Sequence, residues 1–362
     1  LHALYTEFEE QNRQELRSFY SPLKDCDKYI RFLFITGITK VSHVNIFSGL
    51  NQLDDISLDG AYSDLCGISN AELERFFTPE IEALAQEQKM SVSGAKEKLA
   101  SMYDGYHFTS GVAGVLLRCF KQKKFGSYWF ETATPTMLIR TLEKRPADLL
   151  RYTVPIIAQE SNFKEYDPDN ANMLPVFYQS GYLTIKDYDG DSELYTLGIP
   201  NREVEKGMFQ IIIPKFTTIE SDDLGLAVEN FRQAFIHADI ERLAALLKAA
   251  VADIPVLLKK KQCENYYESI THVIFKQTGF SVVSELQSIL GRSDITVTTK
   301  DAVYIFELKM DRGRCFDEVA AEALHQIDAN GYADRFAVAG KQLHKVALVF
   351  SSEGRGLVGW KA

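Results

Sequence analysis

Two acidic residues and a lysine stand at a spacing that suits metal-assisted hydrolysis. Asp294 is followed, after twelve intervening residues, by Glu307 and then by Lys309. Carboxylate oxygens a few ångströms apart suit Mg²⁺ or Mn²⁺, and such an ion can activate water and polarise a phosphoryl oxygen. A nearby ammonium can orient the attacking water and offset the charge that develops on phosphorus. Together these residue types indicate phosphodiester hydrolysis.

A β-hairpin is the element that would gather these side chains. Residues 291–298 and 302–309 are two β-rich runs joined by a short polar turn. Antiparallel pairing around a two-residue turn at 300–301 would set Asp294 opposite Glu307 on one sheet face. Period-2 alternation puts the lysine on that same face. The alternative is an ordinary salt bridge on a purely structural hairpin, which contributes little to stability.

Composition describes a globular chain. The 362 residues carry 40 Lys and Arg against 50 Asp and Glu, a net charge of −10, which argues against coating nucleic acid through bulk charge. Residues 260–362 hold 13 basic and 13 acidic residues, so the acidic excess lies outside them. Five scattered cysteines without a CxxC pair indicate reduced thiols, and no stretch suits a membrane span or signal peptide. We therefore expect a cytoplasmic protein without a membrane partner, and the start without Met suggests a piece of a longer chain.

Two other regions have readable patterns. Residues 29–35 are an apolar run that predicts a buried strand ending in Thr-Gly. Residues 172–213 predict a short helix, a hairpin with an Asp-Gly turn and a second helix, which is the layout of a winged-helix-like module. A hairpin packed on helices for structural reasons is the alternative. Residues 217–224 are the best linker candidate, and two helical stretches follow at 226–236 and 239–252.

The hairpin pattern, with GRSD at its start, resembles the PD-(D/E)xK nuclease superfamily. A following segment with QI and GYA and the strand 345–350 make the resemblance more specific. It implies that Asp294 and Glu307 are ligands of Mg²⁺ or Mn²⁺ and that Lys309 is the catalytic lysine. Ser293 stands where the proline of the name often lies, which is a departure from the pattern.

The resemblance also implies contributions from two helices. A helix before the hairpin would supply a glutamate, either Glu264 or Glu268, and we favour Glu264 because it directly precedes the paired tyrosines. A helix after the hairpin carries Gln326, which would face the site. The alternatives are a solvated face for the glutamates and a packing amide for the glutamine.

The resemblance extends to the N-terminal part of the chain. The segments FITGITK, IFSGLN, YDGYHF, YWFET and GYLTI occur together in a bacterial, Bacteroidetes-type family with an AAA-ATPase-like domain before a PD-(D/E)xK nuclease domain. Thr36 and Lys40 would then lie near a nucleotide, with ATP as the cofactor of the full-length protein. However, no GxxxxGK[ST] phosphate cradle occurs, so we expect no ATPase activity from this chain alone.

These observations predict a mixed α/β fold in four parts. They are the C-terminal part of an AAA-ATPase-like domain (1–110), a helical and winged-helix-like region (111–217), a helical connector (218–259) and a restriction-endonuclease-like nuclease domain (260–362). The function hypothesis is a metal-dependent nuclease that cleaves DNA or RNA. The alternative is an inactive regulatory or defence ATPase module that binds nucleic acid or protein. The sequence leaves the oligomeric state open.

Overall fold

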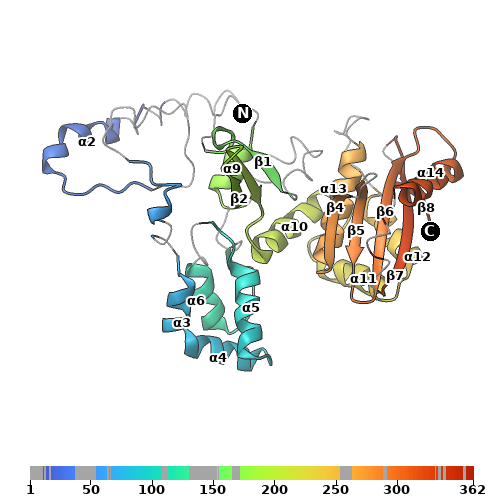
Figure 1. Cartoon of the computed structure of the whole chain (residues 1–362), viewed down its shortest axis with the longest axis horizontal. Coiled ribbons are helices and arrows are strands. Elements are labelled where there is room, and N and C mark those ends of the chain that lie inside the picture. The colour runs from blue at the N-terminus through green and yellow to red at the C-terminus, as the bar shows by residue number, and fades with distance from the viewer. Residues whose placement is uncertain are drawn as a thin grey trace. The chain divides into compact units, whose positions relative to one another are not determined.

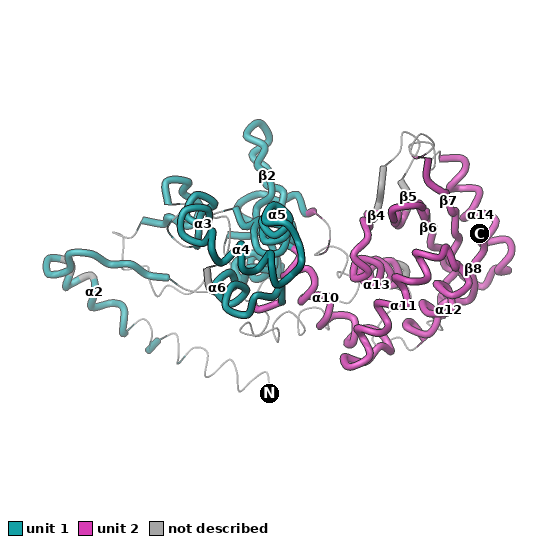
Figure 2. Tube along the Cα trace, turned by 90° about the horizontal axis from the view of Figure 1, so that it is seen from below, with its two compact units in different colours: residues 1–126, 156–201 teal, residues 127–155, 202–362 magenta. Residues whose placement is uncertain are grey.

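The structure of the chain, a computed structural model, divides into two compact units (Figure 2). Unit 1 combines residues 1–126 and 156–201, and unit 2 combines residues 127–155 and 202–362. The structure describes residues 11, 14–15, 18–36, 54–62, 65, 67–107, 113–129, 153, 155–164, 172–252, 263–287, 292–330, 332, 336, 340–353 and 356–362. Both units are therefore built from segments that are not contiguous in the sequence.

Helices form the first part of unit 1. Among the described residues they are α2 (Pro22–Asp25), α3 (Asn70–Phe76), α4 (Thr78–Glu87), α5 (Val92–Tyr103) and α6 (Ala113–Gln122) (Figure 1). A capping box begins α3, because the Ser69 hydroxyl accepts from the Glu72 N–H and the Glu72 carboxylate accepts from the Ser69 N–H. Ile81, Leu84 and Leu99 are buried between α4 and α5. Helices α4 and α5 thus each pack through one apolar stripe.

A three-stranded antiparallel sheet completes unit 1. It consists of β1 (Ile156–Ala158), β3 (Leu194–Gly198) and β2 (Thr184–Asp189) in that order, and α9 (Leu174–Gln179) precedes β2. The short helix and hairpin predicted within residues 172–213 are confirmed, whereas β1 is an addition. The Tyr106 hydroxyl donates to the Gly181 carbonyl at 2.9 Å. Gly105 has a φ of 107°, and a Cβ there would lie 2.1 Å from the Pro200 carbonyl oxygen. This glycine therefore permits the close approach between the YDGY segment and the end of the hairpin.

Unit 2 contains the sheet that carries the candidate site. Its described helices are α10 (Arg202–Phe216), α11 (Leu224–Ile236), α12 (Ile240–Ala250), α13 (Cys263–Gln277) and α14 (Phe316–Ala329). Its described strands are β4 (Ser281–Gln287), β5 (Arg292–Thr298), β6 (Ala302–Met310), β7 (Gln342–Phe350) and β8 (Leu357–Lys361). They lie in the order β4-β5-β6-β7-β8 (Figure 1). All neighbours are antiparallel except β6 and β7, a parallel pair that α14 connects.

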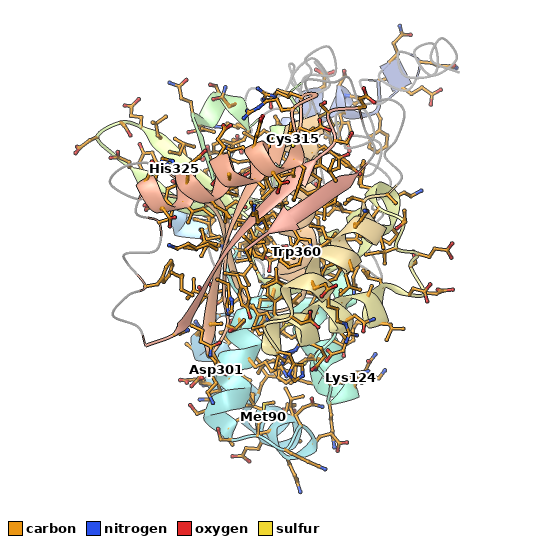
Figure 3. All side chains as sticks on the ribbon, turned by 90° about the vertical axis from the view of Figure 1, so that its right-hand side faces the viewer. Met90, Lys124, Asp301, Cys315, His325 and Trp360 are labelled. Atoms are coloured by element: carbon orange, nitrogen blue, oxygen red, sulfur yellow. The ribbon has the colours of Figure 1, made fainter. Side chains whose placement is uncertain are left out.

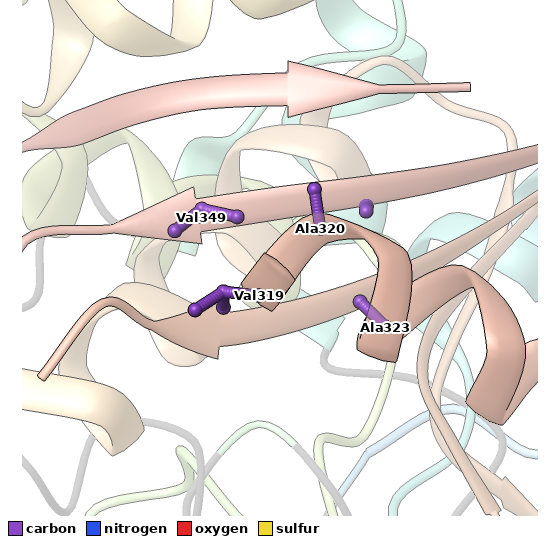
Figure 4. Close-up of a cluster of buried hydrophobic side chains, with 5 residues drawn as sticks. Val319, Ala320, Ala323 and Val349 are labelled. Carbon is purple, nitrogen blue, oxygen red and sulfur yellow. The ribbon is translucent and has the colours of Figure 1, made fainter. Parts of the chain in front are cut away.

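Helix α14 covers one face of this sheet. Its residues Val319, Ala320 and Ala323 are buried against Ala347 and Val349 of β7 (Figure 4). They recur at the spacing of one helical face. The small alanines let the helix lie close to the strands, and α14 therefore closes off the face toward which alternate residues of β6 point.

Aromatic side chains fill the opposite face. The Phe235 ring of α11 lies 5.0 Å from the Tyr304 ring and 6.3 Å from the Phe306 ring, both on β6. Phe275 of α13 packs 5.1 Å from Phe306. Because helices cover both faces, β6 is buried along most of its length, and a charged residue on it needs a specific reason to be there.

Residues 29–35 do not form the buried strand that their sequence predicts. The backbone of residues 30–36 is neither helix nor strand, and the side chains of Tyr29 and Phe32 are 78% and 81% exposed. A strand needs hydrogen-bonded neighbours, and the sheets of the described residues comprise only β1–β3 and β4–β8. The prediction is wrong because an apolar run becomes a buried strand only where another strand pairs with it.

Among the helices that the structure describes, none combines the length and the apolar character that crossing a lipid bilayer requires.

Candidate active site

The hairpin of β5 and β6 has the register that the sequence predicts. Ile295 lies opposite Phe306 in an antiparallel ladder. At the other end, the Thr299 N–H donates to the Ala302 carbonyl at 2.9 Å, which leaves residues 300–301 as the two-residue turn. The register follows from turn length and alternation, and both are readable from the sequence.

Asp294 is held where the ladder between β5 and β6 ends. Extended by one residue beyond the last pair, Ile295 and Phe306, the same register sets it opposite Glu307. Its Oδ2 accepts a hydrogen bond of 2.7 Å from the main-chain N–H of Leu308. The carboxylate thus takes the place of a main-chain acceptor for β6. Because the partner is backbone, the position of this oxygen is fixed by the sheet itself.

Glu307 is a buried carboxyl group with one oxygen paired. Its side chain is 1% exposed, and Oε1 accepts from the Lys309 ammonium at 3.0 Å. Its Oε2 is buried and has no hydrogen-bond partner among the described residues. Burial, and after it the charge of Asp294, raise the pKa of Glu307 to about 7, against the opposing effects of Lys309 and of a hydrogen bond from the Asp294 main chain. When Glu307 is ionised, the Lys309 ammonium therefore pairs with one of its oxygens and leaves the other, Oε2, buried without a partner among the described residues.

Lys309 lies at the rim of the site. Its side chain is 23% exposed, and its hydrogen bond to Glu307 confirms that the two residues share a sheet face. In Figure 3 the β5–β6 turn at Asp301 lies at the opposite end of the sheet from Cys315, the residue that precedes α14. Lys309 is the last but one residue of β6, six residues before Cys315 in the sequence, and so lies toward the end of the strand farther from the turn.

Comparisons with known proteins agree with this arrangement. Residues 262–360 match the family described as the PD-(D/E)XK nuclease superfamily. The C-terminal domain belongs to this superfamily. Residues 1–47 match a second family, described as Predicted AAA-ATPase. The expected mixed α/β fold with a restriction-endonuclease-like nuclease domain, preceded by AAA-ATPase-like sequence, is confirmed.

One curated relative aligns along almost the whole chain. It is a protein of Azotobacter chroococcum mcd 1 described as an uncharacterized protein in the vnfD 5′ region, and it is 30% identical over 357 residues. The alignment covers 96% of this chain and 66% of the relative, so the chain spans about two thirds of that protein's length. No solved structure gives a significant match.

The helical glutamates of the nuclease-superfamily domain lie on α13. The start of this helix is at the Lys309 end of the sheet, because the Tyr267 ring stacks 4.3 Å from Phe350, the residue opposite Met310. Glu264 is in the first turn of α13, and its side chain lies outside the described residues. Glu268, one turn later, is half-buried with its Oε1 enclosed. Since α13 covers the face opposite Glu307, a carboxylate from it would reach the site past the end of the sheet.

Gln326 of the same domain is on α14. It is half-buried and lies between Ala323 and Ile327, which both pack on the sheet. Glu322, one turn earlier, lies within electrostatic reach of Lys309. Gln326 is therefore on the helix that covers the site, one turn farther from the lysine.

The residues expected near a nucleotide are not assembled in the described structure. Thr36 is exposed, in the segment that forms neither helix nor strand. Lys40 lies outside the described residues. Among the residues that are described, no three His, Cys, Asp or Glu side chains gather into a metal-binding group. Asp294 and Glu307 are thus a pair of candidate ligands rather than a complete set.

The turn that follows Lys309 is a feature that the sequence pattern did not indicate. This turn, Asp311–Arg314, carries two arginines next to the candidate site and contacts Glu322 of α14. The available signal was the string Asp-Arg-Gly-Arg directly after the strand that ends in the lysine motif. Its neighbour on α14 is eight residues away from Arg314, a contact that sequence spacing does not specify.

Proposed function

We propose that the C-terminal domain hydrolyses phosphodiester bonds of DNA or RNA with the help of Mg²⁺ or Mn²⁺. In this proposal Asp294 and Glu307 hold the ion, and Lys309 acts on the water and the phosphate. Membership of the nuclease superfamily supports a nucleic-acid substrate.

The buried Oε2 of Glu307 is the observation that carries the proposal. In its ionised form, a fully buried carboxyl group without a partner for one oxygen costs free energy unless a cation balances its charge. The neighbouring Asp294 adds a second negative charge, and both donors are oxygen atoms. Oxygen-only donor sets suit hard divalent cations such as Mg²⁺ and Mn²⁺. The residues present therefore fit such an ion.

The roles of the side chains follow from their contacts. A bound divalent ion would polarise a phosphoryl oxygen and lower the pKa of a bound water. The Lys309 ammonium is anchored by Glu307 and partly exposed, so it can donate hydrogen bonds to a water or to a phosphate oxygen. Asp294 keeps its orientation through the main chain of β6. Glu264 and Gln326 are proposed as further site residues from α13 and α14.

The N-terminal part is proposed to bind ATP in the full-length protein. The match of residues 1–47 to Predicted AAA-ATPase supports this assignment, and Thr36 and Lys40 would then lie near the nucleotide. A four-part division of the chain (1–110, 111–217, 218–259, 260–362) and a cytoplasmic location belong to the same proposal.

A cleavage assay tests the nuclease proposal. Labelled DNA and RNA are incubated with the chain in Mg²⁺ or Mn²⁺, and Lys309→Ala is compared with Lys345→Ala, which removes an exposed lysine on β7. Activity is expected to fall at least a hundredfold for Lys309→Ala and to persist for Lys345→Ala. Activity that survives Lys309→Ala would contradict the assignment of the site.

The alternative function is a module that binds nucleic acid or protein without cleaving it. The ion pair between Lys309 and Glu307 is compatible with this alternative, because buried ion pairs also occur in sites that have a purely structural role. Calorimetry with Mn²⁺ separates the two functions. Heat of binding that disappears in Asp294→Asn supports the metal site, whereas no heat alongside retained nucleic-acid affinity supports the alternative.

A further inference from the structure

The turn after Lys309 has a tightly constrained backbone. It comprises Asp311–Arg314 and connects β6 to α14. Its first N–H donates to the Phe350 carbonyl at 2.9 Å, and its last N–H donates to the carbonyl of its first residue at 2.8 Å. The φ angles of Arg312 and Gly313 are 47° and 77°. A left-handed conformation is unusual for arginine, so it persists only where surrounding contacts enforce it.

The Asp311 carboxylate supplies these contacts. Its Oδ1 accepts from the Ser352 N–H at 2.8 Å and from the Ser352 hydroxyl at 2.6 Å. Burial tends to raise the pKa of Asp311, but hydrogen bonds from Ser352 and from the N–H groups of Arg312 and Gly313 outweigh it and lower the pKa. The turn is therefore fastened to the loop after β7 and presents its arginines from a rigid support.

One of those arginines, Arg314, pairs with a carboxylate of α14. Arg314 donates to Glu322 at 2.7 Å, and the two side chains are 48% and 51% exposed. The hydrogen bond and charge of Arg314, with smaller effects of Lys309 and Arg312, lower the pKa of Glu322. Three cations of the site's rim thus act on one anion that belongs to the protein itself.

We propose that the turn Asp311–Arg314 binds a backbone phosphate of the nucleic acid beside the cleaved bond. When no nucleic acid is bound, Glu322 forms an ion pair with Arg314 in place of that phosphate. This inference rests on the proposed function. A guanidinium binds carboxylate and phosphate through the same pair of donors, so one anion can replace the other. An exposed ion pair is weak and is therefore readily exchanged. The rigid turn loses little conformational freedom when it binds.

The proposal makes the two partners of one ion pair behave in opposite ways. Arg314→Gln removes a phosphate contact, so nucleic-acid affinity is expected to fall about fivefold. The negative slope of log affinity against log salt concentration is expected to become less steep by about one. Glu322→Gln removes the competing anion, so affinity is expected to rise. If the pair served only to stabilise the fold, both changes would act in the same direction.

Fluorescence anisotropy with labelled DNA and RNA of one sequence, in EDTA to prevent cleavage, measures both effects across a salt titration. The matched controls are Lys345→Gln and Asp328→Asn, the two partners of another exposed ion pair between β7 and α14. These controls are expected to leave the affinity and the salt slope unchanged. The loss for Arg314→Gln should be equal on DNA and RNA, because the contact is to phosphate.

The outcomes separate this inference from the proposed function. Weaker binding and a shallower salt dependence for Arg314→Gln, with tighter binding for Glu322→Gln, support the proposal that the turn binds a phosphate. This holds even if the chain cleaves no nucleic acid. A wild-type chain that cleaves nucleic acid while Arg314→Gln behaves like Lys345→Gln overturns the inference alone. A chain that neither binds nor cleaves overturns both. Thermal unfolding of each variant shows whether a loss of nucleic-acid affinity arises from misfolding. The expected increase in affinity for Glu322→Gln cannot arise in that way.

Discussion

Glu307→Gln provides a test of the site that needs neither substrate nor metal. The change keeps the shape of the side chain and an oxygen for Lys309 but removes the ionisable group. The ordinary pKa of this carboxyl group is 4.5, and in the folded protein burial and the charge of Asp294 raise the pKa to about 7. That difference corresponds to about 3 kcal/mol of folding free energy.

The sign of the effect follows from which state binds the proton more tightly. Because the pKa of Glu307 is raised in the folded protein, its favourable contribution is complete below pH 4.5 and is lost as the pH rises through about 7. The metal-free wild type therefore carries the full cost of about 3 kcal/mol at pH 8 and only about 1 kcal/mol at pH 5. Glu307→Gln carries neither cost, so its stability relative to wild type is expected to be about 2 kcal/mol greater at pH 8 than at pH 5.

Urea denaturation in EDTA at these two pH values measures the effect. The chain has two tryptophans, Trp129 and Trp360, and both lie in unit 2, so their fluorescence follows the unit that contains the site. Any difference in packing between the glutamine amide of the variant and the glutamate of the wild type is the same at both pH values. It therefore cancels when the two stability differences are compared. Glu220→Gln, which changes an exposed carboxylate between α10 and α11, is the control and should show no pH-dependent difference. Equal effects of Glu307→Gln at pH 5 and pH 8 would refute the reasoning.

Three other predictions concern metal binding and the fold. Millimolar Mn²⁺ at pH 8 should raise the unfolding temperature of the wild type but not that of Asp294→Asn; an equal rise in both would point to another metal site. Gly105→Ala should lower the stability of unit 1 by about 2 kcal/mol, because the new Cβ would lie 2.1 Å from a carbonyl oxygen at a φ of 107°. The control for that change is Gly225→Ala, where the added Cβ meets nothing within 4 Å, and unfolding followed by circular dichroism should show it to be neutral or slightly stabilising. Ser69→Ala should cost about 1 kcal/mol through loss of the capping box, measurable as faster proteolysis near α3.

Local patterns in the sequence predicted several helices and hairpins of both units. The alternation of β5 and β6 and the short polar turn between them predicted the register correctly, and with it the positions of Asp294 and Glu307. The same reasoning predicted α11 and α12, and the short helix and hairpin around Gly190. These features depend on residues a few positions apart, so the sequence expresses them directly.

Features that depend on distant neighbours were not predicted. The edge strands β4 and β8 were not foreseen, because an edge strand forms where a neighbour offers free hydrogen-bonding groups. The run 29–35 has the composition of a strand, yet no described strand pairs with it. The contact of Arg314 with Glu322 likewise depends on how α14 lies on the sheet.

The sequence by itself determined which chemical groups the site has and the order in which the hairpin presents them. Only the tertiary structure decided their electrostatic state. Glu307 is buried because α14 covers its face of β6, and that burial raises its pKa and leaves one oxygen without a partner. Burial is a property of every element packed around a group, so it arises only when the whole domain has folded.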